Sequence, residues 1–291
     1  VLFRSEDAME WVLSVRAEWL TPIMKIFTFL GDEEFFLLFL PLAYWFWRKQ
    51  VMGRVGMVLL FTFVLNAVIK GIFQVPRPEV IEHLVHADDW SFPSGHSQGA
   101  MVLWGWLAYE LKDKRAYMIA AVLIAGVGFS RVYLGVHYPT DVLGGFLIGF
   151  LTLYAYSCLL KLTPPGWLYL GPTRQSLIIF VLLMRLFMLV PELSEVAIKG
   201  GAAFIGFLAG YLHEKKYLSC SLKPGMNLVI SKLVLGMVGI IVIWMGLKQI
   251  FISIGYTTDM AMFIRYTLLG GWISFGAPYL FCQFGWNLEN K

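Results

Sequence analysis

The sequence has few charged residues and few cysteines. Lys, Arg, Asp and Glu together make up 14% of the 291 residues, whereas soluble domains typically carry about 25%. This scarcity of charge excludes an ordinary soluble domain, and the hydrophobic content of 58% indicates a polytopic membrane protein. None of the three cysteines lies in a C-x2-C pair, which disfavours a zinc site. No basic run of the nucleic-acid-binding kind is present, so no nucleic-acid partner is expected.

Long apolar runs fill most of the chain. A transmembrane helix needs roughly 17–25 mostly apolar residues, which predicts nine spans, near 32–48, 55–75, 94–111, 116–131, 141–162, 174–190, 196–212, 227–248 and 260–282. The fold class is therefore all-α, a polytopic transmembrane helical bundle. Residues 8–20 mix aromatic and charged residues, which favours a helix lying in the membrane interface, so residues 1–31 are predicted to form an interfacial amphipathic N-terminal segment. The first 16 residues show no basic start before an apolar run, and no cleavable signal peptide is expected.

Basic residues in the loops predict the orientation. They gather at one end of the spans, at Arg48, Lys49, Arg54, Lys112, Lys114, Arg115, Lys161, Arg174, Lys215, Lys216 and Lys223. By the positive-inside rule this end faces the cytoplasm. Cys158, Cys220 and Cys282 fall at the same end, where a reducing compartment makes a structural disulfide unexpected.

Three polar motifs interrupt the apolar runs at the opposite, outer end. They are K-x6-R-P at Lys70, Arg77 and Pro78, P-S-G-H at Pro93–His96, and S-R-x5-H-x3-D at Ser130, Arg131, His137 and Asp141. Charged groups at such a depth are costly unless they pair or line a wet cavity. Because hydropathy and loop charge bring all three motifs to one membrane face, they could form one site.

The residue types in these motifs suit a phosphate group. Lys70, Arg77 and Arg131 supply three cations, and an arginine can bind two phosphoryl oxygens at once. Ser94 is a candidate N-cap and Gly95 allows close backbone approach, while free N–H groups at a helix start favour an anion. A carboxylate four residues after an imidazole can hold one ring nitrogen and leave the other free as a nucleophile or base.

Together the three motifs resemble those of the type 2 phosphatidic acid phosphatase (PAP2) family of membrane lipid phosphatases. The resemblance covers about residues 20–162, and every charged motif position is filled. It implies a PAP2-like core of about five to six helices at 32–165, with no metal or other cofactor. It also implies that His137 attacks phosphorus to form a phosphohistidine, that Asp141 orients His137, and that His96 protonates the leaving oxygen. The implied phosphate-binding residues are Lys70, Arg77, Ser94, Gly95 and Arg131.

The expected function is hydrolysis of a lipid phosphate or pyrophosphate at the extracytoplasmic face of a bacterial plasma membrane. Candidate substrates are undecaprenyl pyrophosphate, phosphatidylglycerophosphate, phosphatidate, lipid A phosphate and a sphingoid-base phosphate. The expected partners are therefore a lipid phosphate and membrane lipids. The alternatives are a lipid phosphotransferase that uses the same histidine and a lipid transporter on the same fold. The loop with His83, His86, Asp88 and Asp89 matches no metal-ligand spacing, and a solvated outer loop at the mouth of the site is expected there.

A second region follows the break at Thr163–Gly166. Residues 166–291 have about four spans by length and no motif-like cluster, and they are predicted to form C-terminal transmembrane helices of unknown role. Gly145-x3-Gly149 and Gly206-x3-Gly210 have the small-residue spacing that lets membrane helices approach closely. Packing within one bundle is favoured for these glycines, with a homodimer interface as the alternative.

Overall fold

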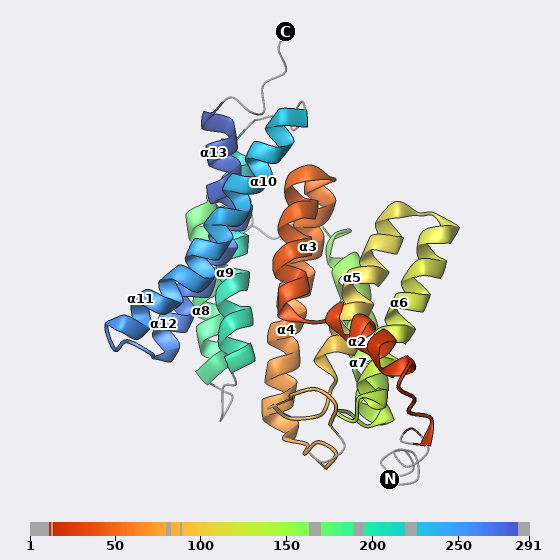
Figure 1. Cartoon of the computed structure of the whole chain (residues 1–291). Coiled ribbons are helices and arrows are strands. Elements are labelled where there is room, and N and C mark those ends of the chain that lie inside the picture. The colour runs from red at the N-terminus through yellow and green to blue at the C-terminus, as the bar shows by residue number, and fades with distance from the viewer. Residues whose placement is uncertain are drawn as a thin grey trace. The chain divides into compact units, whose positions relative to one another are not determined.

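The computed structural model describes residues 12, 14–79, 83–87, 89–162, 170–188, 195–218 and 226–284 (Figure 1). All the regular structure in these ranges is helical, which confirms the predicted all-α class. The helices are α2 (Leu20–Phe29), α3 (Glu33–Phe46), α4 (Lys49–Phe73), α5 (Gly95–Leu111), α6 (Lys114–Tyr133), α7 (Pro139–Leu159), α8 (Pro172–Met188), α9 (Glu195–Tyr217), α10 (Met226–Ile241), α11 (Leu247–Ser253), α12 (Asp259–Gly271) and α13 (Ala277–Gln283). Short π-helical turns at Val242–Gly246 and Trp272–Gly276 join α10 to α11 and α12 to α13.

The nine predicted spans coincide with these helices, with boundaries that differ by a few residues. In the described ranges, five helices are long and apolar enough to cross a membrane: Lys49–Phe73, Lys114–Tyr133, Pro139–Leu159, Glu195–Tyr217 and Leu228–Ser253. Helices α3, α5 and α8 have 14, 17 and 17 residues. They fall short of the roughly 20 residues that span a hydrocarbon core without help from flanking segments.

Contacts divide the chain into two compact units. The first consists of Val1–Leu38, Thr62–Leu162 and Val190–Ser194, and the second of Phe39–Phe61, Thr163–Leu189 and Glu195–Lys291. The division therefore falls inside α3 and α4. All residues of the three polar motifs belong to the first unit.

In the first unit α5 lies against both α6 and α7 (Figure 1). A Cβ added at Gly145 would lie 2.6 Å from the carbonyl oxygen of Ser94, and one added at Gly149 would lie 2.9 Å from the carbonyl oxygen of Gln98. The two glycines therefore let the α7 backbone touch the α5 backbone, as small residues do between membrane helices. The predicted packing of Gly145-x3-Gly149 within one bundle is confirmed.

The helix predicted over 8–20 is present only in part. Residues 12 and 14 are helical, residues 15–19 form turns and irregular backbone, and α2 begins at Leu20; residues 8–11 and 13 lie outside the described residues. Val12 is 3% exposed, Nε of Arg16 donates to the carbonyl oxygen of Tyr133 at 3.0 Å, and the backbone N–H of Ala17 donates to the Tyr133 hydroxyl at 3.0 Å. These tertiary contacts with the end of α6 compete with continuous helix formation, and they fix α2 beside the third motif.

In the second unit α9 and α12 pack backbone to backbone. A Cβ at Gly206 would overlap the carbonyl oxygen of Thr267, and one at Gly270 would overlap that of Ala203. At the start of α4, Lys49 forms an ion pair with Glu214 of α9. This unit therefore holds itself together by close helix contact and by a partly buried charge pair.

The expectation of no structural disulfide is wrong at Cys282, which is disulfide-bonded, whereas Cys158 is free. Cys220 lies outside the described residues. Disulfide formation depends on the distance between Cα atoms in the folded chain, which sequence spacing alone does not reveal.

Candidate active site

The third motif runs from the last turn of α6, through the connecting turn, into the first turn of α7. Gly135 has a φ of 79°, a left-handed conformation that glycine adopts without steric cost. Pro139 occupies the first turn of α7, where its missing N–H costs no helical hydrogen bond. His137 lies in this turn and is 1% exposed, and Asp141 lies in the first turn of α7. The local sequence therefore places a buried imidazole directly before a helix start.

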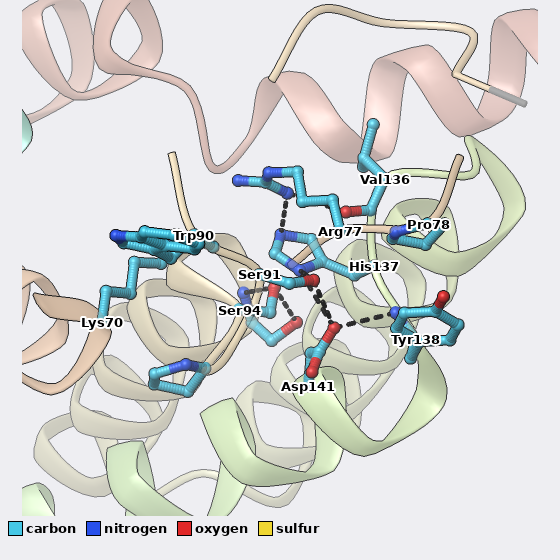
Figure 2. Close-up of polar contacts among 12 residues, drawn as sticks. Lys70, Arg77, Pro78, Trp90, Ser91, Ser94, Val136, His137, Tyr138 and Asp141 are labelled. Carbon is cyan, nitrogen blue, oxygen red and sulfur yellow. Dashed lines mark hydrogen bonds and ion pairs between the residues drawn. The ribbon is translucent and has the colours of Figure 1, made fainter. Parts of the chain in front are cut away.

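His137 and Asp141 are joined through Ser91 (Figure 2). Nδ1 of His137 lies 3.6 Å from Oδ2 of Asp141 and 3.3 Å from the Ser91 hydroxyl, which donates to the same Oδ2 at 2.5 Å. The backbone N–H of Tyr138 also donates to Oδ2, at 2.9 Å. The carboxylate is near the imidazole, as predicted, but 3.6 Å is too long for a hydrogen bond. Ser91 lies between them and provides the hydrogen-bonded link.

The other ring nitrogen of His137 faces a cation. Nε2 lies 3.0 Å from Nη1 of Arg77, and because a guanidinium only donates, Nε2 accepts and its proton is on Nδ1. Burial lowers the pKa of His137 well below its usual value, and the positive charges of Arg77, Arg131 and Lys70 lower it further. At neutral pH the imidazole is therefore uncharged, with the Nε2 lone pair directed at the cations.

The first motif converges on one carboxylate, that of Asp89. Nζ of Lys70 donates to Oδ2 of Asp89 at 2.7 Å and to the carbonyl oxygen of Trp90 at 2.6 Å. The guanidinium of Arg77 donates to Oδ1 of Asp89 through Nη2 and to the Asp89 carbonyl oxygen through Nε at 2.6 Å. Nη1 of Arg77 also donates to the carbonyl oxygen of Val136 at 2.7 Å, which ties the first motif to the third.

The second motif begins α5, as predicted. Ser94 is the N-cap, and its side chain accepts from the backbone N–H of Ser97 at 3.4 Å. The Ser94 N–H donates to the carbonyl oxygen of Asp141 at 2.9 Å. A Cβ at Gly95 would lie 3.1 Å from Oδ1 of Asn66, an α4 side chain that donates to the carbonyl oxygen of Pro93. The motif is thus fixed between α4 and α7.

His96 and Arg131 contact the segment around α2. Nε2 of His96 lies 2.8 Å from Oδ1 of Asp32, and a Cβ at Gly31 would lie 2.6 Å from Cδ2 of the His96 ring. Arg131 is 4% exposed and donates through Nη1 to the Thr28 hydroxyl. Its Nε has no hydrogen-bond partner in the described part of the chain, so this buried guanidinium retains a donor for a ligand. A group of three His, Cys, Asp or Glu residues that could hold a metal ion is not found in the described ranges.

Comparison with known proteins assigns these motifs to a family. A profile described as "PAP2 superfamily" matches residues 51–163, and one described as "PAP2 superfamily phosphatase, transmembrane extension" matches residues 198–290. The chain is 38% identical over 153 residues to phosphatidylglycerophosphatase B of Bacillus subtilis (strain 168), a match that covers 48% of this chain and 75% of that protein. The chain belongs to the PAP2 superfamily. The resemblance inferred from the three motifs is confirmed.

Two further relatives of this PAP2 protein match over less of their own length. Sphingosine-1-phosphate phosphatase 2 of Mus musculus is 30% identical, over 47% of this chain and 40% of that protein. Undecaprenyl-diphosphatase BcrC of Bacillus subtilis is 34% identical, over 39% of this chain and 61% of that protein. The chain therefore spans less than two thirds of either. With five helices able to cross a membrane and a match to the transmembrane extension, the PAP2 protein is an integral membrane protein.

Three polar residues of the PAP2 protein's site were not predicted, namely Asp32, Asp89 and Ser91. Asp32 precedes its partner His96 by 64 positions, so no spacing rule connects them. Asp89 was expected in a solvated loop, but its side chain is 24% exposed and pairs with two cations. Charge balance could have identified Asp89 from the sequence, because clustered cations that are buried need a nearby anion.

Proposed function

We propose that this PAP2 protein hydrolyses a lipid phosphate or pyrophosphate through a phosphohistidine formed on His137. The observation that carries the proposal is the arrangement around the imidazole. Nδ1 is held by Ser91 and Asp141, while Nε2 is unprotonated and faces Arg77. A neutral, oriented imidazole beside several cations is suited to attack a phosphorus atom that carries negative charge.

In the proposed first step Nε2 of His137 bonds to phosphorus as the bond from phosphorus to the lipid oxygen breaks. His96 gives its proton to the departing oxygen, and Lys70, Arg77 and Arg131 neutralise the phosphoryl oxygens. Water then attacks the phosphohistidine and gives a proton to His96, which releases phosphate and restores the Nε2 lone pair. Before the first step, Arg77 must turn its Nη1 from the imidazole to a phosphoryl oxygen.

The proposed substrate is a lipid because the site belongs to an integral membrane protein and the named relatives are phosphatases of lipid phosphates. Every proposed reacting residue lies in the first unit, so we assign catalysis to the core at 32–165 and no reacting group to residues 166–291. We extend the proposal to a site at the extracytoplasmic face, which the distribution of basic residues in the loops favours by the positive-inside rule.

The direct test is phosphate release by the purified full-length protein in detergent with EDTA. The assay offers phosphatidylglycerophosphate, phosphatidate, undecaprenyl pyrophosphate and sphingosine-1-phosphate in separate reactions. We expect release from at least one lipid at a rate that EDTA leaves unchanged, because side-chain cations neutralise the phosphoryl group. If the folded protein releases phosphate from none of the four lipids, the proposed function is wrong.

Asp32 is proposed as a positioning residue for His96. Its carboxylate accepts from Nε2 at 2.8 Å, which orients the ring. We expect Asp32→Asn to lower kcat by about 10- to 100-fold with a lipid phosphate. This is less than the roughly 10²- to 10⁴-fold that general acid catalysis contributes, because His96 itself remains.

Leaving-group dependence separates this role from a structural one. With p-nitrophenyl phosphate, whose leaving oxygen needs little protonation, the loss in Asp32→Asn should be under about threefold. An equal loss with both substrates would show that Asp32 does not act through the acid. Asp113→Asn is the control, because Asp113 is the N-cap of α6 and asparagine is an equally good cap.

A further inference from the structure

The carboxylate of Asp89 lies between the two cations of the first motif. One oxygen accepts from Lys70 and the other from Arg77, so the two cations are bridged by a single anion. The side chains of Lys70 and Arg77 are only 5% and 11% exposed, whereas that of Asp89 is 24% exposed. The cations are therefore fixed and covered, while the anion between them is the more accessible member of the group.

Asp89 carries its negative charge at neutral pH. Burial alone would raise the pKa of its carboxyl, but the charges of Lys70 and Arg77 and their hydrogen bonds outweigh burial and hold that pKa below its ordinary value. A carboxylate and a phosphoryl group present the same chemistry to these donors, because both offer acceptor oxygens that lysine contacts singly and arginine contacts in pairs. The two groups compete for the same N–H donors.

We propose that Asp89 is a built-in competitor that occupies the phosphate site of the unliganded protein and selects for a terminal phosphate. The proposal rests on the proposed function for the identity of the incoming anion. A terminal phosphate carries a charge near −2 at neutral pH, which exceeds the single charge of the carboxylate that it displaces. The phosphodiester of an ordinary phospholipid carries a charge of only −1, so it gains little by displacing Asp89.

Such selection has a use in a membrane. Phosphodiester lipids surround an integral membrane protein at high local concentration, and their headgroups present oxygens of the same kind as those of the substrate. Without Asp89, the buried cations would bind these phosphodiester headgroups, which would keep the substrate out of the site. While Asp89 pairs with Lys70 and Arg77, an incoming anion must form contacts stronger than these two charge-assisted contacts. An anion of higher charge does so.

The test measures anion binding directly, without turnover. Isothermal titration of the detergent-solubilised full-length protein at pH 7.5 uses two probes, inorganic phosphate and the phosphodiester dioctanoyl phosphatidylglycerol. In Asp89→Asn, which keeps the shape but removes the charge, we expect the dissociation constant of each probe to fall at least tenfold, equivalent to about 1.4 kcal/mol. The wild type should bind the phosphodiester at least tenfold more weakly than phosphate. Because displacing Asp89 costs the same free energy for either probe, the variant should tighten both by a similar factor and keep that ratio.

One control separates competition from a general change in charge. Asp113→Asn removes a carboxylate at the N-cap of α6, which lies outside the three motifs, and it should change phosphate affinity by less than about threefold. Unchanged or weaker binding in Asp89→Asn would show that Asp89 only positions the cations, and equal tightening in Asp113→Asn would show a general charge effect. Either result overturns the proposal.

Thermal unfolding establishes that each variant is folded, and Asp89→Ser provides a second uncharged side chain if asparagine is not tolerated. Failure of this proposal and failure of the proposed function give different results. If the wild type releases no phosphate from any lipid but Asp89→Asn binds phosphate more tightly, Asp89 is a competitor and the proposed hydrolase function is wrong. If the wild type hydrolyses a lipid but Asp89→Asn binds phosphate no more tightly, the hydrolase function stands and the competitor role is wrong.

Discussion

His137→Gln is expected to reduce phosphate release from a lipid phosphate by on the order of 10⁴-fold or more, the scale on which removing a nucleophile acts. Glutamine offers an amide oxygen and an NH2 group of similar reach, so it can accept from Arg77 and donate toward Ser91 in the same turn. It has no nitrogen lone pair able to bond to phosphorus. The change therefore removes the nucleophile while leaving most of the hydrogen bonds around it available.

The covalent intermediate gives this prediction a second measurement. Wild-type protein mixed briefly with a lipid carrying labelled phosphorus and then denatured in alkali should retain label, because a phosphohistidine survives alkali, and His137→Gln should retain none. His213→Gln is the matched control, since His213 lies on α9 in the second unit and contacts Thr173 and the Ala209 carbonyl oxygen. Its rate should stay within about twofold of the wild type. Labelling of His137→Gln, or a rate within tenfold of the wild type, would remove His137 from the role of nucleophile.

The helices of the fold followed from the sequence because the bilayer permits so few alternatives. A run of apolar residues long enough to span the hydrocarbon must satisfy its own backbone, and the helix does so within one segment. The predicted runs at 55–75 and 141–162 therefore appear as α4 and α7. The N-terminal segment was less predictable, because the side chains that decide its path, such as Arg16, bind the end of α6 more than 100 residues away.

Some residues of the candidate site could likewise be predicted from the sequence, and others could not. The spacing of His137 and Asp141 within one turn and one helix start made their proximity predictable, and the structure brings Arg77 and Lys70 to them. Asp32 and Asp89 could not be placed, because each meets its partner only after separate helices have packed. Loop residues are located by tertiary contacts rather than by periodicity, and a search of the loops for charge-balancing groups would have been needed to find them.

Gly145→Ala is expected to have the second large effect on activity, because it disturbs the contact between α5 and α7. The added Cβ would lie 2.6 Å from the carbonyl oxygen of Ser94, closer than two such atoms approach without displacement, and the obstacle is backbone that cannot rotate away. Helix α7 must therefore move from α5, which stretches the hydrogen bond from the Ser94 N–H to the Asp141 carbonyl oxygen. That movement separates His96, on α5, from His137 and Asp141.

A separation of about 1 Å between the acid and the nucleophile is sufficient to cost on the order of 10²-fold in rate. We expect a loss of that size in kcat/KM for a lipid phosphate in Gly145→Ala. Helix propensity works in the opposite direction, because alanine stabilises a helix interior by about 1 kcal/mol relative to glycine. An activity loss in a protein that remains folded would therefore report geometry rather than helix weakening.

Gly105→Ala makes the comparison sharp, because it places the same methyl group in the same α5–α7 contact farther from the motifs. Its Cβ would lie 2.9 Å from Cδ1 of Leu153 and 3.9 Å from Sδ of Met101. The leucine side chain can change rotamer to make room. Activity in Gly105→Ala should stay within about threefold of the wild type. If Gly145→Ala is equally active, the two helices tolerate displacement, and the site does not depend on the backbone contact between Ser94 and Gly145. If only Gly145→Ala loses activity, the small residues in α7 act by setting the distance across which the proton and the phosphoryl group are transferred.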